Sequence, residues 1–146
     1  MHSITLRFLA ASGAPSASGR IQGGTVLLWA DEAGLACASA WAHGDCATAF
    51  VGSTSFLRPV RPGDLVEVEA RLAYTGGSSM SMAIEVRAGS VQSRELQPVT
   101  HCVAVYAAVG DDGQPRAVDA WTPETPGDIA LAQRVKAHID AARAAQ

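Results

Sequence analysis

Two adjacent carboxylates, Asp31 and Glu32, interrupt the most apolar stretch of this chain, GGTVLLWADEAGLACASA. The pattern of this stretch predicts a helix that starts near Gly23 and ends around His43 and Gly44, where a glycine can adopt the left-handed cap conformation. A carboxylate in a dry environment can serve as a general base or as a nucleophile. This pair is therefore the first candidate for chemistry.

The two carboxylates fall on different faces of the predicted helix, at about 100° per residue. Glu32 belongs to a narrow polar strip that consists of Thr25, Glu32, Ser39 and His43. Asp31 shares its face with the neighbours Gly24, Leu27, Leu28, Gly34, Leu35 and Ala38. Because the opposite side is apolar as well, we do not expect one sheet alone to cover this helix.

Two explanations for Asp31 are open at this point. In the structural one, a basic residue or local backbone donors pair with the carboxylate, which is otherwise costly to bury. In the functional one, Asp31 is a catalytic carboxylate in a dry pocket, one or two helical turns from Gly23 and Gly24. Those glycines would open the helix, where free N–H groups and the helix dipole stabilise a developing oxyanion and a substrate carbonyl can approach closely.

The elements that position these residues follow from the rest of the pattern. The hydrophobic pattern predicts strands over residues 3–9, 48–57 and 99–109. A turn is predicted at Pro62-Gly63-Asp64. Two alternating segments between them predict an antiparallel hairpin with one dry and one wet face. The dry face holds Val66, Val68, Ala70, Leu72, Tyr74, Met80, Met82, Ile84 and Val86.

Beyond Pro126 the pattern is that of an amphipathic helix. Its apolar stripe consists of Leu131, Val135, Ile139 and Ala142. The order of strand, long helix, four strands and tail helix predicts an α+β fold. We expect a single domain over residues 1–146, with its core at about residues 3–118 and a C-terminal tail and helix at 119–146.

Composition limits the classes of function. The chain has 146 residues, of which 48% are hydrophobic and 17% charged, with a net charge of -3. It is too apolar for a disordered chain, and it has no basic cluster for nucleic acid or an anionic membrane. No apolar run approaches the roughly 20 residues of a membrane span. Arg7 splits the apolar N-terminal segment, so we expect a strand there rather than an export signal.

Cysteine and histidine patterns argue against a metal or a thiol nucleophile. Cys37, Cys46 and Cys102 show no metal-binding spacing, and they suit a reducing cytoplasm as small core residues or free thiols. No elbow or catalytic signature surrounds any of them. His43 and Asp45 beside Cys46 lack standard zinc spacing, so we predict no metal site. His101 shares a predicted strand face with Val99, Val103 and Val105, which favours a core or interface histidine.

Five segments in a fixed order resemble a known family. They are SGRIQGG…WADEAGLACA (18–38), Thr48, FLRPVRPGDLVEVEA (56–70), GGSSMSMAIEV (76–86) and AAVGDDGQPRAV (107–118). Over roughly residues 16–118 the chain is similar to acyl-CoA thioesterases of the hotdog fold, particularly the short bacterial acyl-CoA hydrolases. The resemblance implies a central α-helix wrapped by a curled antiparallel sheet. It also implies a homodimer, or a tetramer or hexamer built from dimers, with active sites at the dimer interface.

The resemblance assigns roles to individual residues. Asp31 matches the family's catalytic aspartate, which activates water or attacks the thioester directly, and we favour water activation. Gly24, next to Gly23, lies where a backbone N–H would polarise the thioester carbonyl. Thr48 matches a strand threonine that positions the carboxylate or the water. Many relatives have an asparagine before the helix where this chain has Ser16, which can donate one hydrogen bond but has no amide.

Two further segments line the coenzyme A groove in relatives. The Arg58 guanidinium would meet a phosphate there, and the backbone of Gly77, Ser78 and Ser79 would meet the pantetheine amides. For Arg58 the alternative is a solvated charge at a strand end.

The sequence as a whole predicts a cytoplasmic acyl-CoA thioester hydrolase that releases a carboxylic acid and coenzyme A. We expect no cofactor, because coenzyme A is part of the substrate. One alternative is a hotdog module that binds acyl-CoA without turnover, against which the apolar setting of Asp31 argues. Another is a thioesterase for acyl groups carried on a protein.

Overall fold

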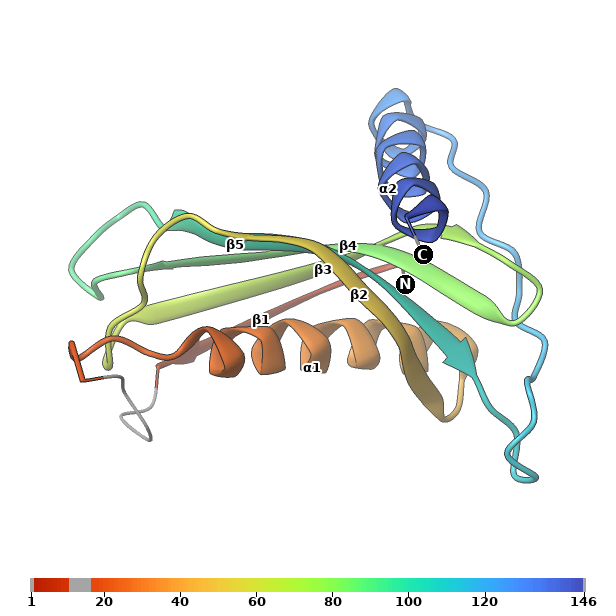
Figure 1. Cartoon of the computed structure of the whole chain (residues 1–146), viewed down its shortest axis with the longest axis horizontal. Helices are drawn as coiled ribbons and strands as arrows, with labels where there is room; N and C mark the ends of the chain where they lie inside the picture. Colours follow the sequence, from red (N-terminus) through yellow and green to blue (C-terminus); the bar gives the residue numbers. More distant parts are fainter. Residues whose placement is uncertain (1, 11–16, 146) are drawn as a thin grey trace.

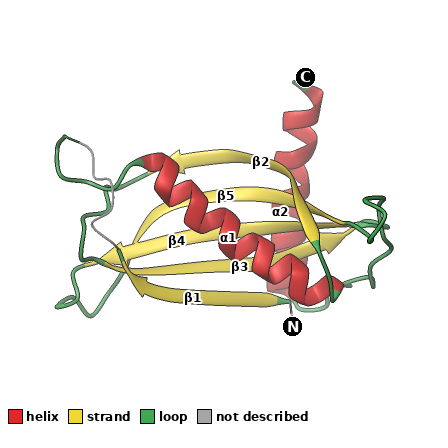
Figure 2. Ribbon diagram, turned by 90° about the horizontal axis from the view of Figure 1, so that it is seen from below, coloured by secondary structure: helices red, strands yellow, loops and turns green. Residues whose placement is uncertain are grey.

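The structure, a computed structural model, describes residues 2–10 and 17–145. Its elements are β1 (Ser3–Leu9), α1 (Gly23–Ala42), β2 (Cys46–Phe56), β3 (Leu65–Thr75), β4 (Ser79–Gly89), β5 (Gln97–Ala108) and α2 (Pro126–Ala144). The strands form one antiparallel sheet in the order β1-β3-β4-β5-β2. The sheet curls around α1 on one side and carries α2 on the other (Figures 1 and 2). The predicted α+β hotdog architecture is confirmed.

Helix α1 packs on the sheet through small side chains. Its buried residues are Val26, Ala30, Ala33, Gly34, Cys37, Ala38 and Ala42. None of the residues that the structure describes covers the other side of α1, where Leu28 is 54% exposed. The sequence therefore predicted correctly that one sheet does not cover the whole helix.

The C-terminal cap of α1 differs from the prediction. His43, and not Gly44, adopts the left-handed conformation, with φ of 55°. The N–H groups of His43 and Gly44 both donate to the Ser39 carbonyl and close the last turn. A Cβ at Gly44 would lie 2.6 Å from Nη2 at the end of the flexible Arg116 side chain.

The hairpin of β3 and β4 has the predicted dry face, with one exception. Val66, Val68, Ala70 and Leu72 lie in the core under α1 together with the methionines, Ile84 and Val86 of β4. A register shift between Leu72 and Tyr74 ends this alternation. Tyr74 consequently packs on the opposite side of the sheet, against the cluster beneath α2.

His101 is exposed in this chain, which rules out a core position, whereas its alternative assignment as an interface histidine stays a prediction. The pairing of β4 with β5 shifts register after Val86. As a result Val99 joins the core under α1, whereas Val103 and Val105 face α2. Val103 and Val105 therefore share the outer face with His101, as predicted, and Val99 does not.

Helix α2 covers part of the outer face of the sheet. Leu131, Val135 and Ile139 are buried against Val103 and Val105, as the predicted stripe requires, while Ala142 is only half-buried. The helix begins after Thr125, whose side chain accepts a hydrogen bond from the Asp128 N–H. Asp128 in turn pairs with Arg71 of β3 at 3.3 Å. Over residues 2–10 and 17–145, no helix is both long and apolar enough to cross a membrane.

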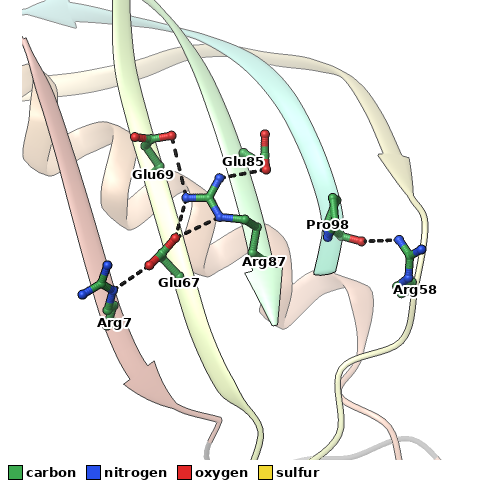
Figure 3. Close-up of polar contacts among 7 residues, drawn as sticks. All are labelled: Arg7, Arg58, Glu67, Glu69, Glu85, Arg87 and Pro98. Carbon is green, nitrogen blue, oxygen red and sulfur yellow. Dashed lines mark hydrogen bonds and ion pairs between the residues drawn. The ribbon is translucent and has the colours of Figure 1, made fainter. Parts of the chain in front are cut away.

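A charged cluster lies on the outer face of β1, β3 and β4 (Figure 3). Glu67 accepts hydrogen bonds from Arg7 at 2.6 Å and from Arg87 Nη2 at 2.5 Å. Arg87 also binds Glu85 at 2.8 Å and lies 3.8 Å from Glu69. Hydrogen bonds from Arg7 and Arg87 lower the pKa of Glu67 below its usual value. This cluster joins β1, β3 and β4 on the side of the sheet away from α1.

The lowered pKa of Glu67 predicts a pH-dependent contribution to stability. Because the folded-state pKa lies below the unfolded one, the stabilisation is present above about pH 4.5 and is lost as the pH falls further. Glu67→Gln should lower the free energy of unfolding by about 1 kcal/mol at pH 7, a modest value because Arg7 is exposed. Denaturant unfolding at pH 7 and pH 3.5 checks this, with the exposed Glu124→Gln as control. An equal loss at both pH values would contradict the account.

Candidate active site

The Asp31 carboxylate is half-buried and is held by two hydroxyl groups. Thr48 Oγ1 of β2 donates to Asp31 Oδ1 at 2.9 Å. The Tyr106 hydroxyl of β5 donates to the same oxygen at 3.1 Å and lies 3.4 Å from the Asp31 carbonyl. Asp31 Oδ2 accepts no hydrogen bond from residues 2–10 and 17–145. One carboxylate oxygen is thus fixed, and the other is free to meet a water molecule or a substrate.

The sequence prediction missed Tyr106. It is fully buried on the face of β5 that packs under α1, between Ala104 and Ala108. Burial and the nearby charge of Asp31 raise the pKa of its hydroxyl, so the group stays protonated and can donate. A signal was available in the sequence, because a tyrosine on a buried strand face needs a hydrogen-bond partner for its hydroxyl.

Glu32 lies apart from this site. It is exposed, and none of the described residues forms a hydrogen bond or an ion pair with its side chain. The helical wheel therefore separated the two carboxylates correctly into a half-buried and a solvated one.

A cavity of about 470 Å³ opens beside the N-terminus of α1. Gly23 and Gly24 begin the helix after Gln22, so their N–H groups have no acceptor within it. A Cβ at Gly24 would meet nothing within 4 Å, whereas one at Gly23 would lie 3.2 Å from Phe56 Cζ. The apolar lining consists of Ile21, Val26, Phe56, Leu57, Pro59, Val60 and Val99.

Arg58 lies at the mouth of the same cavity. Its Nη1 donates to the Pro98 carbonyl at 3.0 Å, and the side chain is exposed (Figure 3). The remaining N–H groups of the guanidinium are available for an anion. Arg58 is therefore tethered at a strand end and still able to bind a phosphate.

The predicted site residues do not all meet within one chain. Gly24 and Asp31 are seven residues apart, about 10 Å along the helix axis. Arg58 lies near the N-terminus of α1, whereas Gly77–Ser79 form the turn at the other end of the sheet, near the C-terminus of α1 (Figure 1). Ser16 lies outside the described residues.

All three cysteines are free and buried. Burial raises the pKa of Cys37 and of Cys102 to about 11, and it also raises that of Cys46. Since the thiolate is the reactive form, none of these groups is activated. Among the described residues, no three His, Cys, Asp or Glu side chains are grouped so that they could hold a metal ion.

Comparison with known families identifies the class of enzyme to which this fold belongs. A model of the thioesterase superfamily matches residues 18–94. The chain belongs to this superfamily and is an enzyme of the thioesterase class. The resemblance inferred from the five sequence segments is therefore confirmed.

Two relatives of the same name are similar to most of this chain. The acyl-CoA thioester hydrolase YciA of Salmonella typhimurium is 37% identical over 116 residues, which cover 77% of this chain and 87% of the relative. The Escherichia coli protein of the same name is 36% identical over 118 residues, which cover 79% of this chain and 89% of the relative.

Solved structures show the same architecture. A hexameric thioesterase from Yersinia pestis is 36% identical, with a TM-score of 0.75 over 80% of this chain and 94% of the other. The acyl-CoA hydrolase of Staphylococcus aureus superposes with a TM-score of 0.87 over 97% of this chain and 87% of the other. At 22% identity, the latter similarity concerns the fold alone.

The state of the cysteines predicts that no thiol takes part in turnover. Replacing Cys37, Cys46 or Cys102 singly by alanine or serine should leave kcat within about twofold of wild type, because no thiolate is present at neutral pH. Cys37 packs between α1 and the sheet, so its truncation should lower the melting temperature of the protein. Thioester hydrolysis and thermal unfolding of each variant check this. A variant that folds normally and has no turnover would contradict it.

Proposed function

We propose that this protein hydrolyses acyl-CoA thioesters to a carboxylic acid and coenzyme A. The observation that carries the proposal is the Asp31 carboxylate, half-buried on an apolar helix face and held through Oδ1 only. Binding of acyl-CoA alone would not require a carboxylate in this position. The relatives at 36–37% identity are named acyl-CoA thioester hydrolases, which supports the substrate class.

In the proposed mechanism Asp31 acts as a general base. It removes a proton from a water molecule, and the water oxygen attacks the thioester carbonyl carbon. The tetrahedral oxyanion is stabilised by the free backbone N–H of Gly24 at a helix N-terminus. The intermediate then collapses, the C–S bond breaks, and the proton held by Asp31 passes to the coenzyme A thiolate. No metal or organic cofactor is required in this scheme.

We infer that the complete site is shared by two chains. Strand β2, which carries Thr48, is an unpaired edge of the sheet and has no charged side chain in its eleven residues. Its Val51 is 41% exposed and Phe56 is 51% exposed. A long uncharged edge is a surface for pairing with another strand, and a second copy is the simplest partner. The Yersinia pestis relative, a hexameric thioesterase, supports an oligomer.

Antiparallel pairing of two β2 edges would also complete the site. A two-fold axis at this edge reverses the direction of the second copy. The N-terminus of its α1, with Gly24 and Arg58, would then approach the Asp31 and Gly77–Ser79 of the first copy. The apolar side of α1 around Leu28 would be covered by the same contact. This arrangement joins residues that one chain holds apart.

The remaining roles follow from this arrangement. Arg58 would bind a phosphate of coenzyme A, and the backbone of Gly77, Ser78 and Ser79 would bind the pantetheine amides. The apolar cavity beside Gly23 would take the acyl chain. Ser16 would donate a single hydrogen bond where relatives have an asparagine. The three free, buried cysteines favour a reducing cytoplasm as the location of the reaction.

The adjacent carboxylates of Asp31 and Glu32 should respond differently to substitution. Asp31→Asn is nearly isosteric but cannot accept the proton, so it should lower kcat by about 10²–10⁴-fold while acyl-CoA binding persists. Glu32→Gln, the matched control on the solvated strip, should change kcat by less than about tenfold. Steady-state hydrolysis with thiol detection and calorimetric binding measure both effects. Near-normal turnover by Asp31→Asn, or loss of turnover only in Glu32→Gln, would refute the assignment.

The shared site predicts that assembly and activity are lost together. A lysine at an edge strand opposes strand pairing, so Val51→Lys should shift the protein toward a monomer and remove most of the hydrolysis. Val91→Lys is the control, because Val91 is 61% exposed in the loop between β4 and β5. Light scattering and hydrolysis assays test this. A folded wild-type monomer that is active at micromolar concentration would contradict a site built from two chains.

A further inference from the structure

We propose that Tyr106 is a positioning residue for this reaction. Its hydroxyl and that of Thr48 hold Asp31 Oδ1, so that Oδ2 is the oxygen that receives the proton from water. The inference rests on the proposed function, because it assigns the reactive atom of the same carboxylate.

The two donors approach the carboxylate as a pair from neighbouring strands. Thr48 and Tyr106 are direct partners in the antiparallel register of β2 and β5. Their hydroxyl groups lie 2.9 and 3.1 Å from the same oxygen of Asp31. A carboxylate oxygen has two lone pairs, and this pair of donors occupies both. None of the described residues donates to Oδ2 of Asp31, which therefore keeps its acceptor capacity.

This arrangement also fixes the orientation of the carboxylate. The terminal torsion of an aspartate is broad, so a carboxylate without partners samples many orientations. Two hydrogen bonds from a rigid sheet restrict that rotation and direct Oδ2 consistently. A general base must lie within hydrogen-bond distance of the proton that it removes, so a fixed orientation favours the reaction.

Gly34 provides independent support for the role of the tyrosine hydroxyl. A Cβ at this position would lie 2.0 Å from Tyr106 Oη and 2.6 Å from Cζ. A glycine inside a helix costs about 1 kcal/mol relative to alanine. Helix α1 therefore tolerates a destabilising residue one turn after Asp31, and this glycine leaves the space in which the hydroxyl reaches the carboxylate.

The test compares Tyr106→Phe with Tyr74→Phe. Tyr106→Phe keeps the ring in the core and removes only the hydrogen bond, whereas Tyr74 lies across the sheet beside α2. Tyr106→Phe should lower kcat about tenfold or more and leave KM within about threefold. The acidic limb of its pH–rate profile should move to higher pH, because a hydrogen bond to a carboxylate favours the ionised form. Tyr74→Phe should retain the wild-type kcat and profile.

A second measurement does not depend on the stability of Tyr106→Phe. The chain has two tyrosines, so 3-fluorotyrosine incorporated throughout the Tyr74→Phe variant labels position 106 alone. The fluorinated phenol is more acidic and a stronger donor, so the acidic limb should move to lower pH. Movement in opposite directions for the two changes supports the inference, because a purely structural role of the ring predicts no movement.

The outcomes separate this inference from the proposed function. If both tyrosine changes leave kcat and the pH profile unchanged while Asp31→Asn is inactive, Tyr106 is structural and the inference is wrong. If the wild-type protein fails to hydrolyse acyl-CoA, or Asp31→Asn retains turnover, the proposed function itself fails.

Discussion

An ionised carboxylate beside an apolar helix–sheet interface is stable only if hydrogen-bond donors replace the water that it loses. Asp31 meets this condition through Thr48 and Tyr106, which come from two adjacent strands. The small residues of α1 are required for the same reason, since a larger side chain at Gly34 would displace the tyrosine hydroxyl. The packing of α1 on the sheet and the orientation of the Asp31 carboxylate therefore depend on one contact, between Gly34 and the Tyr106 hydroxyl.

The curvature of the sheet places these donors around α1. Register shifts occur in β2 directly after Thr48 and again between Gly52 and Ser55. Ser53 has a φ of 51° within the second irregularity. Such bulges bend a strand and increase its local twist. β2 is consequently wrapped along α1 and leaves its outer edge, free of charged side chains, available to a second chain.

Local sequence patterns were sufficient to predict most of the architecture. Alternation predicted the β3–β4 hairpin and helical periodicity predicted α1 and α2, because both signals reflect which side chains are buried. The separation of Asp31 from Glu32 followed from the same periodicity. The same helix pattern suggested an oxyanion site at Gly23 and Gly24, whereas the predicted role of Thr48 came only from the family resemblance, since nothing local in the sequence connects it with Asp31.

Features that depend on strand pairing could not be predicted. Tyr106 faces Asp31 only because β5 pairs with β2 in one particular register, which the sequence of either strand does not specify. Register shifts also moved Tyr74 and Val99 to faces other than the predicted ones. His101 became exposed because α2 covers only part of the outer face. The departures of Tyr74 and Val99 arise from irregular strand pairing rather than from residue preferences.

The central claim is that Asp31 Oδ2 lies next to the carbon atom that water attacks. A crystal structure of the Asp31→Asn variant with an intact acyl-CoA tests this most directly, because the substitution preserves the shape of the site. The account predicts the thioester carbonyl carbon about 5 Å from the side chain at position 31, with one water molecule between them, on the side away from Thr48 and Tyr106. It also predicts the carbonyl oxygen at the N-terminus of α1 from a second chain. A thioester bound away from position 31, or a site complete within one chain, would contradict the account.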